Sequence, residues 1–256
     1  MPEVVDLYTD IDSCIDAGED CTYLNLSSED FGKSMPNSST WAKMKHLKHL
    51  DMRNSFTGRK RIPFQLTAIP RLESLTLSDN EFSELPSRKA LESWNNLVYL
   101  NLSNNEFSRI PKRIEALENL DYLDLNNNKL SFISPGIGNL KFLRIFKAMN
   151  NSLTSLPEEL GNLSEWGNIN ELWFSNNHLE TIPKTLGKLK SLHALYLDGN
   201  KLTTLPLSLK NLDPEVVEAQ RNKIASLPEG LTIKTKFLAN NPITIWKTPQ
   251  KTPQEV

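Results

Sequence analysis

Hydrophobic residues recur along this chain in a frame that repeats about every 23 residues. In each unit, apolar residues occupy positions one, four, six and eleven and asparagine occupies position nine, as in the segment from Leu97 to Phe107. Positions four and six are two residues apart, which is the period of a strand with one buried face. Each coil is too thin to bury a core alone, so the pattern predicts a stack of coils, a solenoid.

The units can be aligned on the asparagine, and the central ones are more regular than the terminal ones. Glu29 and Ser55 replace asparagine near the start, and Lys236 stands at a normally buried position near the end. Terminal units are expected to be atypical because their outer faces meet water. The ten units begin at Cys21, Leu47, Leu72, Leu97, Leu120, Leu143, Ile169, Leu192, Pro214 and Ile233.

Between the expected strands, an apolar residue followed by proline recurs, as at Leu156-Pro157 and Leu205-Pro206. Proline is tolerated at a turn or at a first helical position, where no ladder hydrogen bond is lost. We therefore expect short 3₁₀ or α turns on the outer side of each coil. The insertions at residues 31–44 and 87–96 are expected to form loops or additional helical turns.

The two ends of the chain lie outside this frame. Apolar residues from Val4 to Ile15, including Leu7, Tyr8 and Ile11, recur at helical spacing and predict an amphipathic helix that covers the first coil. The last segment is polar, contains proline and has no apolar face, so we expect it to be disordered. The predicted domains are an N-terminal helical cap over residues 1–20, a solenoid over 21–246 and a disordered tail over 247–256.

The segments from Leu153 to Leu163 and from Ile182 to Leu192 resemble the leucine-rich repeats of the roughly 23-residue intracellular class. That class includes Ras-suppressor-like scaffolds, and similar units occur in effectors that intracellular bacteria inject into host cells. The resemblance implies an α/β fold, a right-handed solenoid or horseshoe with a parallel sheet on the concave face and short 3₁₀ or α turns on the convex face. It says little of the partner, because members share the frame and vary the residues that bind.

The repeated asparagine has a structural explanation. Its amide offers two donors and an acceptor, so at the end of each strand it can bond backbone groups of its own coil and of the adjacent coil. The residues concerned are Asn80, Asn105, Asn128, Asn151, Asn177, Asn200, Asn222 and Asn241.

Composition and charge exclude several classes of function. Charged residues are 23% of the chain and the formal net charge is -2, which gives neither a nucleic-acid footprint nor an acidic disordered composition. The basic run Arg59-Lys60-Arg61 is interpreted as a solvated loop, and no apolar run approaches the ~20 residues that span a bilayer. We expect no nucleic-acid or membrane partner, and a monomer when the protein is free.

No group of residues in the sequence indicates catalysis. His46 and His49 are close together, but no cysteine or further histidine completes a metal site around them. A Gly-rich phosphate loop and a nucleophile elbow are both missing from the sequence. We therefore expect no enzymatic activity, no metal and no cofactor.

Cysteine usage bears on the compartment. Cys21 occupies core position one and Cys14 lies on the apolar side of the expected helix, so both are interpreted as packing residues, and a bridge between them stays open. Extracellular members of the family usually cap their ends with clusters of disulfides, and the first residues lack the order of a secretory signal. Three of the five Asn-x-Ser sequons arise from the repeat itself. These observations favour a cytoplasmic location, or the host cytoplasm for a secreted bacterial effector.

Positions three, five and seven should project from the concave face, opposite the buried positions four and six. At positions three and five, six of the twenty residues are aromatic, although aromatics are 8% of the chain. Strand propensity alone favours aromatics, but a group of them facing solvent indicates anchors for a partner, and the surrounding acids favour a basic one. The predicted partner contacts are Tyr99, Tyr122, Asp124, Ile145, Lys147, Met149, Trp173, Tyr196, Asp198, Glu218 and Phe237.

The sequence thus predicts a non-catalytic module whose concave face binds one partner protein and which acts by occlusion or scaffolding. It would serve as a cytoplasmic scaffold, as a host-directed bacterial effector or as an inhibitor of another protein. A structural or surface adhesion protein is the alternative, and an enzyme is the least favoured class.

Overall fold

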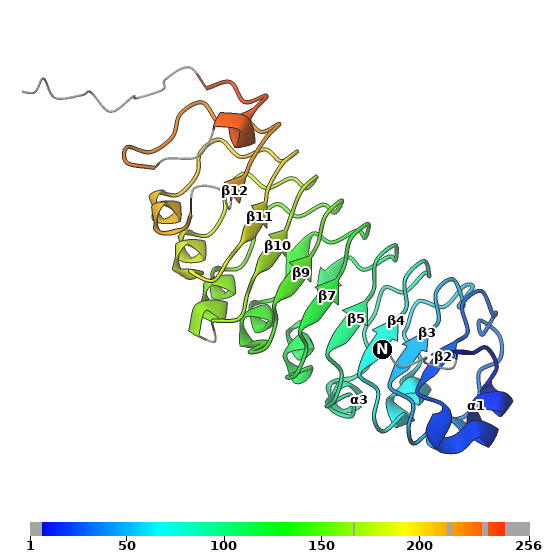
Figure 1. Cartoon of the computed structure of the whole chain (residues 1–256). Helices are drawn as coiled ribbons and strands as arrows, with labels where there is room; N and C mark the ends of the chain where they lie inside the picture. The colour runs from blue at the N-terminus through cyan, green and yellow to red at the C-terminus, as the bar shows by residue number, and fades with distance from the viewer. Residues whose placement is uncertain (1–6, 166, 214–216, 232–234, 244–256) are drawn as a thin grey trace, which may run out of the picture.

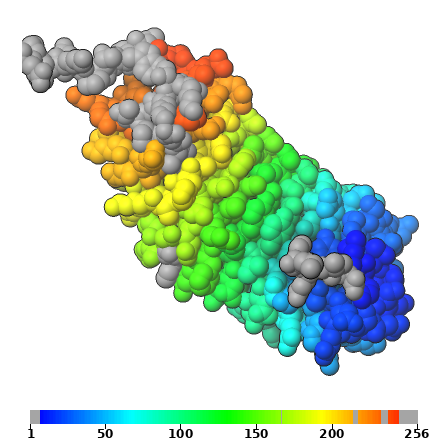
Figure 2. All heavy atoms as spheres, in the orientation of Figure 1, coloured from blue at the N-terminus to red at the C-terminus, as the bar shows by residue number. Residues whose placement is uncertain are grey.

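The computed structural model describes residues 7–165, 167–213, 217–231 and 235–243, which form an elongated stack of coils (Figure 1). Each central coil contributes one short strand to a common sheet and returns through a short helical turn on the opposite side. Successive coils lie as adjacent bands from the N-terminal to the C-terminal end of the stack (Figure 2). The predicted solenoid with strands on one face and short turns on the other is confirmed.

The strands of the described residues form one parallel sheet of 10 strands and a separate parallel pair. In the large sheet, position four of each unit aligns with position four of the next, so Leu100 pairs with Leu123 and Leu123 with Phe146. The large sheet contains β1 Leu7–Tyr8, β2 Tyr23–Asn25, β3 His49–Asp51, β4 Ser74–Thr76, β5 Tyr99–Asn101, β7 Tyr122–Asp124, β9 Ile145–Lys147, β10 Glu171–Trp173, β11 Ala194–Tyr196 and β12 Val217–Glu218; the pair is β6 Arg109–Ile110 with β8 Phe132–Ile133.

Short helices cover the side opposite the large sheet. Proline occupies the N-cap position before several of the 3₁₀ turns, as Pro183 and Pro206 do, which agrees with its tolerance at helix starts. Of the three α-helices found in the described residues, two fall in the insertions for which helical turns were predicted. The helices are α1 Ile11–Ala17, α2 Ser38–Trp41 and α3 Arg88–Glu92, and the 3₁₀ turns are η1 Gly18–Asp20, η2 Phe64–Ala68, η3 Lys112–Ala116, η4 Pro135–Asn139, η5 Glu158–Glu165, η6 Lys184–Lys188, η7 Leu207–Asn211 and η8 Thr235–Leu238.

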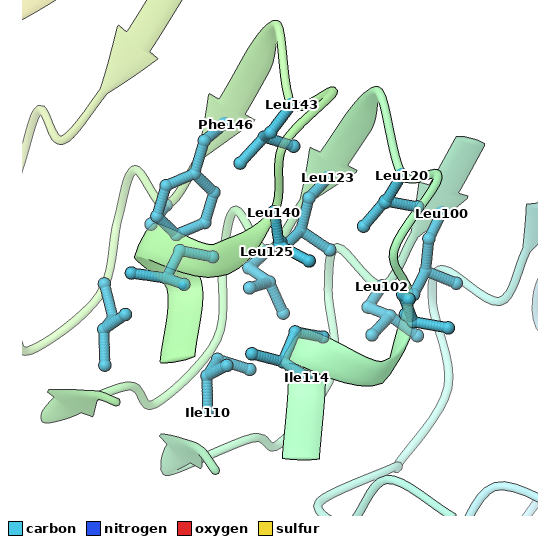
Figure 3. Packing of buried hydrophobic residues seen from close by; sticks show 14 of the residues in the cluster. Leu100, Leu102, Ile110, Ile114, Leu120, Leu123, Leu125, Leu140, Leu143 and Phe146 are labelled. Atoms are coloured by element: carbon cyan, nitrogen blue, oxygen red, sulfur yellow. The ribbon is translucent and has the colours of Figure 1, made fainter. Parts of the chain in front are cut away.

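The core runs along the inside of the coils, between the sheet and the turns. Leu123 and Leu125 point inward from β7 and the residues after it, while Ile114 enters from η3 and Leu140 from the end of η4 (Figure 3). All four side chains are fully buried. Burying one leucine-sized side chain contributes about 1.5 to 3 kcal/mol, so the repeated frame supplies most of the driving force for stacking.

The frame asparagines form the expected hydrogen-bonded ladder. The Nδ2 of Asn151 donates to the carbonyl oxygens of Leu125, Ala148 and Met149 at 2.9, 3.2 and 3.1 Å, and its Oδ1 accepts the Leu130 amide at 2.8 Å. Each such residue therefore ties its own coil to the preceding one through both a donor and an acceptor. Equivalent bonds are made by Asn80, Asn105, Asn128, Asn177, Asn200, Asn222 and Asn241.

Position eight, just before the frame asparagine, has a conformational role that sequence reasoning missed. Its residue lies in the left-handed region in each unit, with φ of 55° at Asn127 and 66° at Gly199. Asparagine, aspartate and glycine adopt this region at least cost, which explains their recurrence there. The exposed amides of neighbouring units also bond one another, from Asn150 Nδ2 to Asn127 Oδ1 at 2.7 Å and from Asn176 Nδ2 to Asn150 Oδ1 at 2.9 Å.

The N-terminal segment differs from the predicted single helix. Leu7 and Tyr8 form β1, which pairs with β2, and the helix α1 begins only at Ile11. Asp10 fixes this start, because its Oδ1 accepts the Ser13 amide at 2.8 Å, and the edge of β2 offers backbone groups that the preceding residues satisfy as a strand. Val4, also assigned to the helix, lies outside the described residues.

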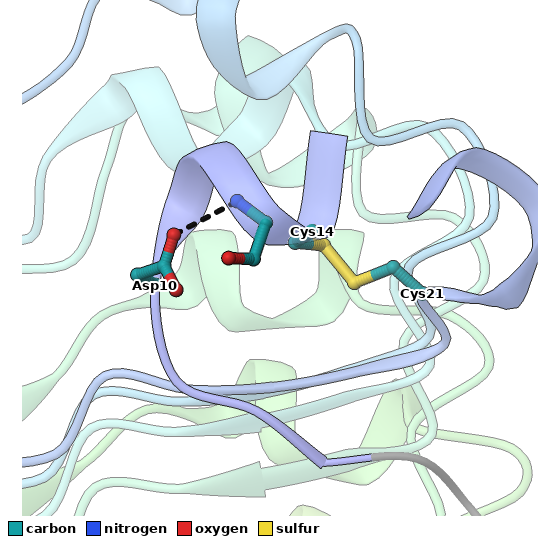
Figure 4. Close-up of a disulfide and its surroundings, with 4 residues drawn as sticks. Asp10, Cys14 and Cys21 are labelled. Atoms are coloured by element: carbon teal, nitrogen blue, oxygen red, sulfur yellow. Dashed lines mark hydrogen bonds between the residues drawn. A yellow bond between two sulfur atoms is a disulfide. The ribbon is translucent and has the colours of Figure 1, made fainter. Parts of the chain in front are cut away.

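The bridge between Cys14 and Cys21 that the sequence left open is formed in the structure. Both are buried as expected, but they form a disulfide across a Cα–Cα distance of 5.2 Å (Figure 4). The bond joins α1 to the first core position of the solenoid, and so fastens the cap to the coil that it covers. The scarcity of cysteines was part of the argument for a cytoplasmic location, and a disulfide between the two weakens that argument.

The last unit also departs from the expected strand. Thr235–Leu238 forms the 3₁₀ turn η8, and the tenth strand of the sheet is instead β1 at the opposite end. The backbone ladder continues nevertheless, because the Ala219 and Arg221 amides donate to the carbonyl oxygens of Phe237 and Ala239 at 2.8 and 2.9 Å. A terminal coil is held from one side, so its backbone is less constrained to be extended. The predicted disordered tail lies outside the described residues.

No helix in the described residues is both long enough and apolar enough to cross a bilayer.

Candidate functional site

The concave face presents positions three, five and seven of each coil, as predicted from the period-two frame. On its N-terminal half, Tyr99 of β5 and Tyr122 of β7 are cross-strand partners, and their rings stack with centroids 4.5 Å apart and planes 12° apart. Both rings are half-buried. The stack therefore offers one flat apolar surface held by the sheet register.

A second aromatic pair lies two strands further along. Trp173 of β10 and Tyr196 of β11 are cross-strand partners with ring centroids 4.3 Å apart. Between the two pairs, the Lys147 ammonium of β9 lies 4.6 Å from the Trp173 ring centroid and 5.2 Å from that of Tyr122. We call Tyr99, Tyr122, Lys147, Trp173 and Tyr196 the aromatic strip, which crosses five consecutive strands of the sheet.

Asp124 holds the Tyr122 side chain of the aromatic strip in place. Its side chain is nearly buried, its Oδ2 accepts the Tyr122 hydroxyl at 3.2 Å and its Oδ1 accepts the Asn126 amide at 2.8 Å. Burial raises the pKa of Asp124, although the Asn126 amide, the Lys147 ammonium and the Tyr122 hydroxyl oppose the rise. Burial and the Asp124 charge also raise the pKa of Tyr122, so its hydroxyl stays a donor. Asp124 was predicted as a partner contact, and the structure gives it this internal role.

Ile145 and Met149 flank the strip. Ile145 aligns with Tyr122 on one side and with Glu171 on the other, and is half-buried. Met149 is half-buried at position seven, where its amide donates to the Asn126 Oδ1 at 2.7 Å. Phe237, by contrast, packs against the hydrophobic core from the 3₁₀ turn η8. Phe237 therefore differs from the other predicted contacts, because it lies in a 3₁₀ turn and its side chain packs against the core.

The C-terminal half of the face is acidic. Glu218 of β12 is the cross-strand partner of Tyr196, and Asp198 follows Tyr196 by two residues on the same side of the sheet. The Glu171 Oε2 accepts the Trp173 indole N–H at 2.8 Å, a role that the sequence did not reveal. Burial raises the pKa of Tyr196, and the charges of Glu218, Glu171 and Asp198 raise it further.

The N-terminal end of the face carries a smaller cluster that was not among the predicted contacts. Tyr23 and His49 stack with ring centroids 6.0 Å apart. Next to them the Arg53 Nη2 lies 2.7 Å from the Asp51 Oδ2, so this nearly buried carboxylate has its own counter-ion. Tyr23, His49 and Asp51 occupy positions three and five of their units, as the aromatic strip does, and Arg53 occupies position seven, so the repeat frame could have located this cluster.

A groove also lies outside the concave face, beside the residues that enter the strands. It has a volume of about 570 Å³ and is lined by Glu73, Asn96, Val98, Asn119, Asp121 and Phe142. Val98 and Phe142 are 41% and 52% exposed, and Asp121 is paired with Arg144. Sequence reasoning missed this groove because it examined positions three, five and seven and not the residues beside position one.

Within the described residues, no three histidine, cysteine, aspartate or glutamate side chains converge in a way that could hold a metal ion. His46 instead lies near Glu19, with 3.9 Å between Nε2 and Oε1. The concave face offers flat aromatic surfaces, a lysine ammonium held over two of them and several carboxylates.

Comparison with known proteins agrees with this architecture. The leucine rich repeat family matches residues 70–130, and also residues 168–189 and 191–212. No curated protein matches the chain significantly. A solved leucine-rich repeat protein of Leptospira interrogans is 26% identical with a TM-score of 0.73, over 94% of this chain and 66% of that one.

Two receptor structures are also similar. The Arabidopsis receptor kinase HAESA, solved with the peptide hormone IDA and the co-receptor SERK1, is 31% identical with a TM-score of 0.62, over 78% of this chain and 34% of that one. TLR13, solved with ssRNA13, has a TM-score of 0.73 at 21% identity, which shows the fold alone. The chain spans about two thirds of the Leptospira protein and about a third of HAESA. The repeat matches, the asparagine ladder and these structures together identify the chain as a leucine-rich repeat protein.

Proposed function

We propose that this chain is a non-catalytic recognition module that holds one protein partner on its concave face. The observation that carries the proposal is the aromatic strip, because five side chains are fixed side by side on a face that the core does not use. Aromatic side chains dominate the binding energy of many interfaces, and rings already stacked in the free protein lose little freedom on binding. A partner would therefore meet a preorganised surface.

The comparisons support the same role at the level of the family. HAESA was solved with a peptide hormone, and it is 31% identical to this chain over 78% of this chain and 34% of HAESA. The similarity is one of fold, while the binding residues of each protein are its own. Binding would act by occlusion, through covering an active surface of the partner, or by scaffolding, through holding two proteins together.

Two settings are compatible with this mechanism. The 26% identity to a Leptospira interrogans protein supports a bacterial protein, such as a host-directed effector, and the repeat class supports an intracellular scaffold. The alternative is a structural or surface adhesion protein. The Cys14–Cys21 disulfide favours that alternative, because disulfides persist mainly in oxidising environments.

Affinity capture with matched variants tests the proposal. The wild-type chain is compared with a Trp173→Ala, Tyr196→Ala double variant, and with a Phe64→Ala, Phe132→Ala variant that removes two exposed aromatics outside the concave face. A partner that the first variant loses and the second retains supports recognition by the strip. Partners that both variants retain, in folded proteins, would place the binding surface elsewhere and overturn the proposal.

A further inference from the structure

A small pocket lies outside the concave face, where the chain runs from the frame asparagine into the 3₁₀ turn. Arg109 begins β6, Pro111 is the N-cap of η3 and Arg113 lies within η3. The pocket has a volume of about 330 Å³ and is lined by Ser83, Glu84 and Leu85 of one coil and by Ser108, Arg109, Pro111 and Arg113 of the next. It is therefore formed between two coils and is separate from the aromatic strip.

The Arg113 side chain is partly buried and incompletely bonded. Its Nη2 donates to the Leu85 carbonyl oxygen at 3.1 Å, which fixes the guanidinium against the preceding coil. Its Nε is shielded from solvent and has no hydrogen-bond partner in the described part of the chain. Buried N–H groups nearly always have an acceptor, and a cation withdrawn from water is costly without an opposite charge nearby. Arg113 therefore retains both charge and donors for a ligand.

The two guanidinium groups of the pocket have no counter-ion. Within the described residues, neither Arg109 nor Arg113 lies within ion-pair distance of a carboxylate. Glu84 is the one carboxylate among the lining residues, and its Oε2 accepts the Nε and Nη2 of Arg61 at 2.9 and 2.6 Å. Because Arg61 balances Glu84, the lining keeps an excess of two positive charges.

We propose that this pocket binds a phosphate monoester, with Arg109 and Arg113 as its two cations and the exposed Ser108 hydroxyl as a further donor. A phosphate monoester carries a charge of about -1.5 to -2 at neutral pH and three acceptor oxygens, which matches two guanidinium groups. A carboxylate carries one charge and would neutralise half of the excess. The site is additional to the proposed function, because it lies outside the face on which that function rests.

The surroundings of the pocket favour a phosphate carried by a polypeptide. Phe132 is the cross-strand partner of Arg109 and is 51% exposed, so an apolar surface lies next to the cations. A phosphorylated side chain would bring neighbouring residues that cover this ring, whereas free phosphate would not. The same chemistry thus has two sources, and the affinities of a phosphopeptide and of inorganic phosphate distinguish them.

The test follows the Arg113 Nε–H signal in the ¹⁵N-labelled full chain by NMR, after assignment with an Arg113→Lys variant. The peptide acetyl-Gly-phosphoserine-Gly-amide and inorganic phosphate are titrated separately at constant ionic strength, and the serine and aspartate peptides are matched probes. We expect a saturable shift with both phosphates, a weaker effect with aspartate and none with serine. Binding should be tighter above the second pKa of the phosphate, about 6, because the dianion matches the two cations.

Charge variants localise the effect. Arg109→Gln should weaken binding of the phosphoserine peptide by roughly three- to tenfold, and Glu84→Gln should strengthen it by removing the carboxylate of the lining. Arg71→Gln removes the same charge from an exposed position outside the lining and should leave the affinity unchanged.

The outcomes separate a phosphate site from general attraction between charges. Tighter binding of the phosphoserine peptide than of inorganic phosphate would assign the phosphate to a partner chain, and the reverse order would assign it to a free ligand. Equal shifts with the serine and phosphoserine peptides, or equal weakening by Arg109→Gln and Arg71→Gln, would overturn the site. A response to inorganic phosphate with none to the phosphopeptide would also overturn it and leave an adventitious ion only. Loss of a partner by the Trp173→Ala, Tyr196→Ala variant is independent of all these results.

Discussion

The Lys147 ammonium lies 4.6 Å from the centroid of the Trp173 ring, and the two residues are cross-strand partners in β9 and β10. The same ammonium lies 5.2 Å from the Tyr122 ring. A cation over an aromatic face at a partly exposed site contributes about 0.5 to 1 kcal/mol. The sequence predicts Lys147 as a charged contact for a partner. In the structure its ammonium interacts with two aromatic rings of the protein itself, and it thereby joins the two aromatic pairs of the strip.

Trp173→Ala should separate binding from stability. The indole projects from the concave face and leaves no core cavity when it is removed, so the free energy of unfolding should change by less than about 1 kcal/mol. Affinity for a partner held by the strip should fall about thirtyfold, which corresponds to about 2 kcal/mol. Urea unfolding and calorimetric titration with the captured partner measure the two quantities.

Leu172→Ala is the matched control for this prediction, because Leu172 precedes Trp173 and is fully buried. Its truncation should destabilise the protein by roughly 2 to 5 kcal/mol. If Trp173→Ala unfolds the protein while Leu172→Ala is tolerated, the assignment of the two faces is inverted. If Trp173→Ala folds and retains full affinity, the partner binds elsewhere.

Asn151→Ala should destabilise the protein by about 1 to 3 kcal/mol for the buried backbone groups that lose their partner. The Asn151 amide donates to the Leu125 carbonyl oxygen and accepts the Leu130 amide hydrogen, both in the preceding coil, and the residue is 7% exposed. The exposed Asn95, changed to alanine, controls for loss of the amide alone, and its unfolding curve should match that of the wild type within ~0.5 kcal/mol. Similar curves for the two variants would argue against a structural ladder.

The regular coils could be predicted from the sequence because one local frame is repeated in each of them. Leu100, Leu123 and Phe146 stand at position four of successive units, so the same packing problem has the same solution each time. The placement of Trp173 and Tyr196 at position five, on the concave face, follows from the same period of two. The residues of the strip could therefore be predicted from the sequence, because the register of the strands alone places equivalent positions of neighbouring units side by side.

Features that depend on contacts between units of different sequence could not be predicted from the repeat pattern. The stack of Lys147 between Tyr122 and Trp173 depends on the rotamers of three coils, and β1 depends on the open edge of β2. The Cys14–Cys21 bond requires the turn η1 to bring α1 back over the first coil, which no periodicity describes. Such end and cross-coil contacts are set by tertiary structure.

Removal of the disulfide should weaken the N-terminal cap. Closing a loop of this size, with a sequence separation of 7, removes unfolded-state entropy equivalent to about 2 to 3 kcal/mol. A Cys14→Ser, Cys21→Ser variant should therefore show faster hydrogen exchange at α1 and β1, with little change at β10 and β11. Equal protection at both ends of the solenoid, relative to the wild type, would show that the bond does not hold the cap.

The redox state of the same two cysteines tests the location. Our prediction of a cytoplasmic location requires that they be reduced in the native cell, where thiols are kept free. Rapid alkylation of the native cells followed by mass spectrometry should then find both thiols modified. Protection of both in the native cells would contradict a cytoplasmic location and favour an oxidising compartment.

Gly187→Ala should push two coils apart. A Cβ at this position would lie 2.3 Å from the Ser208 carbonyl oxygen of the next turn, so η6 and η7 approach as closely as they do only because the side chain is missing. Overpacking of this kind costs about 1 to 3 kcal/mol. Lys210 follows the buried Leu209 in η7 as Gly187 follows Leu186 in η6, and Lys210→Ala should leave the unfolding midpoint in urea unchanged. If the two variants have the same unfolding midpoint in urea, the close approach of η6 and η7 does not contribute to stability.

Asp124→Asn should stabilise the protein at neutral pH. Burial raises the pKa of Asp124 above its ordinary value of 3.8, so the folded state prefers the protonated carboxyl. The stability that this preference contributes is present below the ordinary pKa and is lost as the pH rises through the raised folded pKa. Asparagine keeps an oxygen for the Asn126 amide but does not ionise, so it avoids that loss. The variant should therefore unfold at higher urea concentration than the wild type at pH 7, and the difference should shrink as the pH falls toward 3.8. A variant less stable than the wild type at pH 7 would show instead that the charged Asp124 is a net stabilising partner of Lys147 and Tyr122.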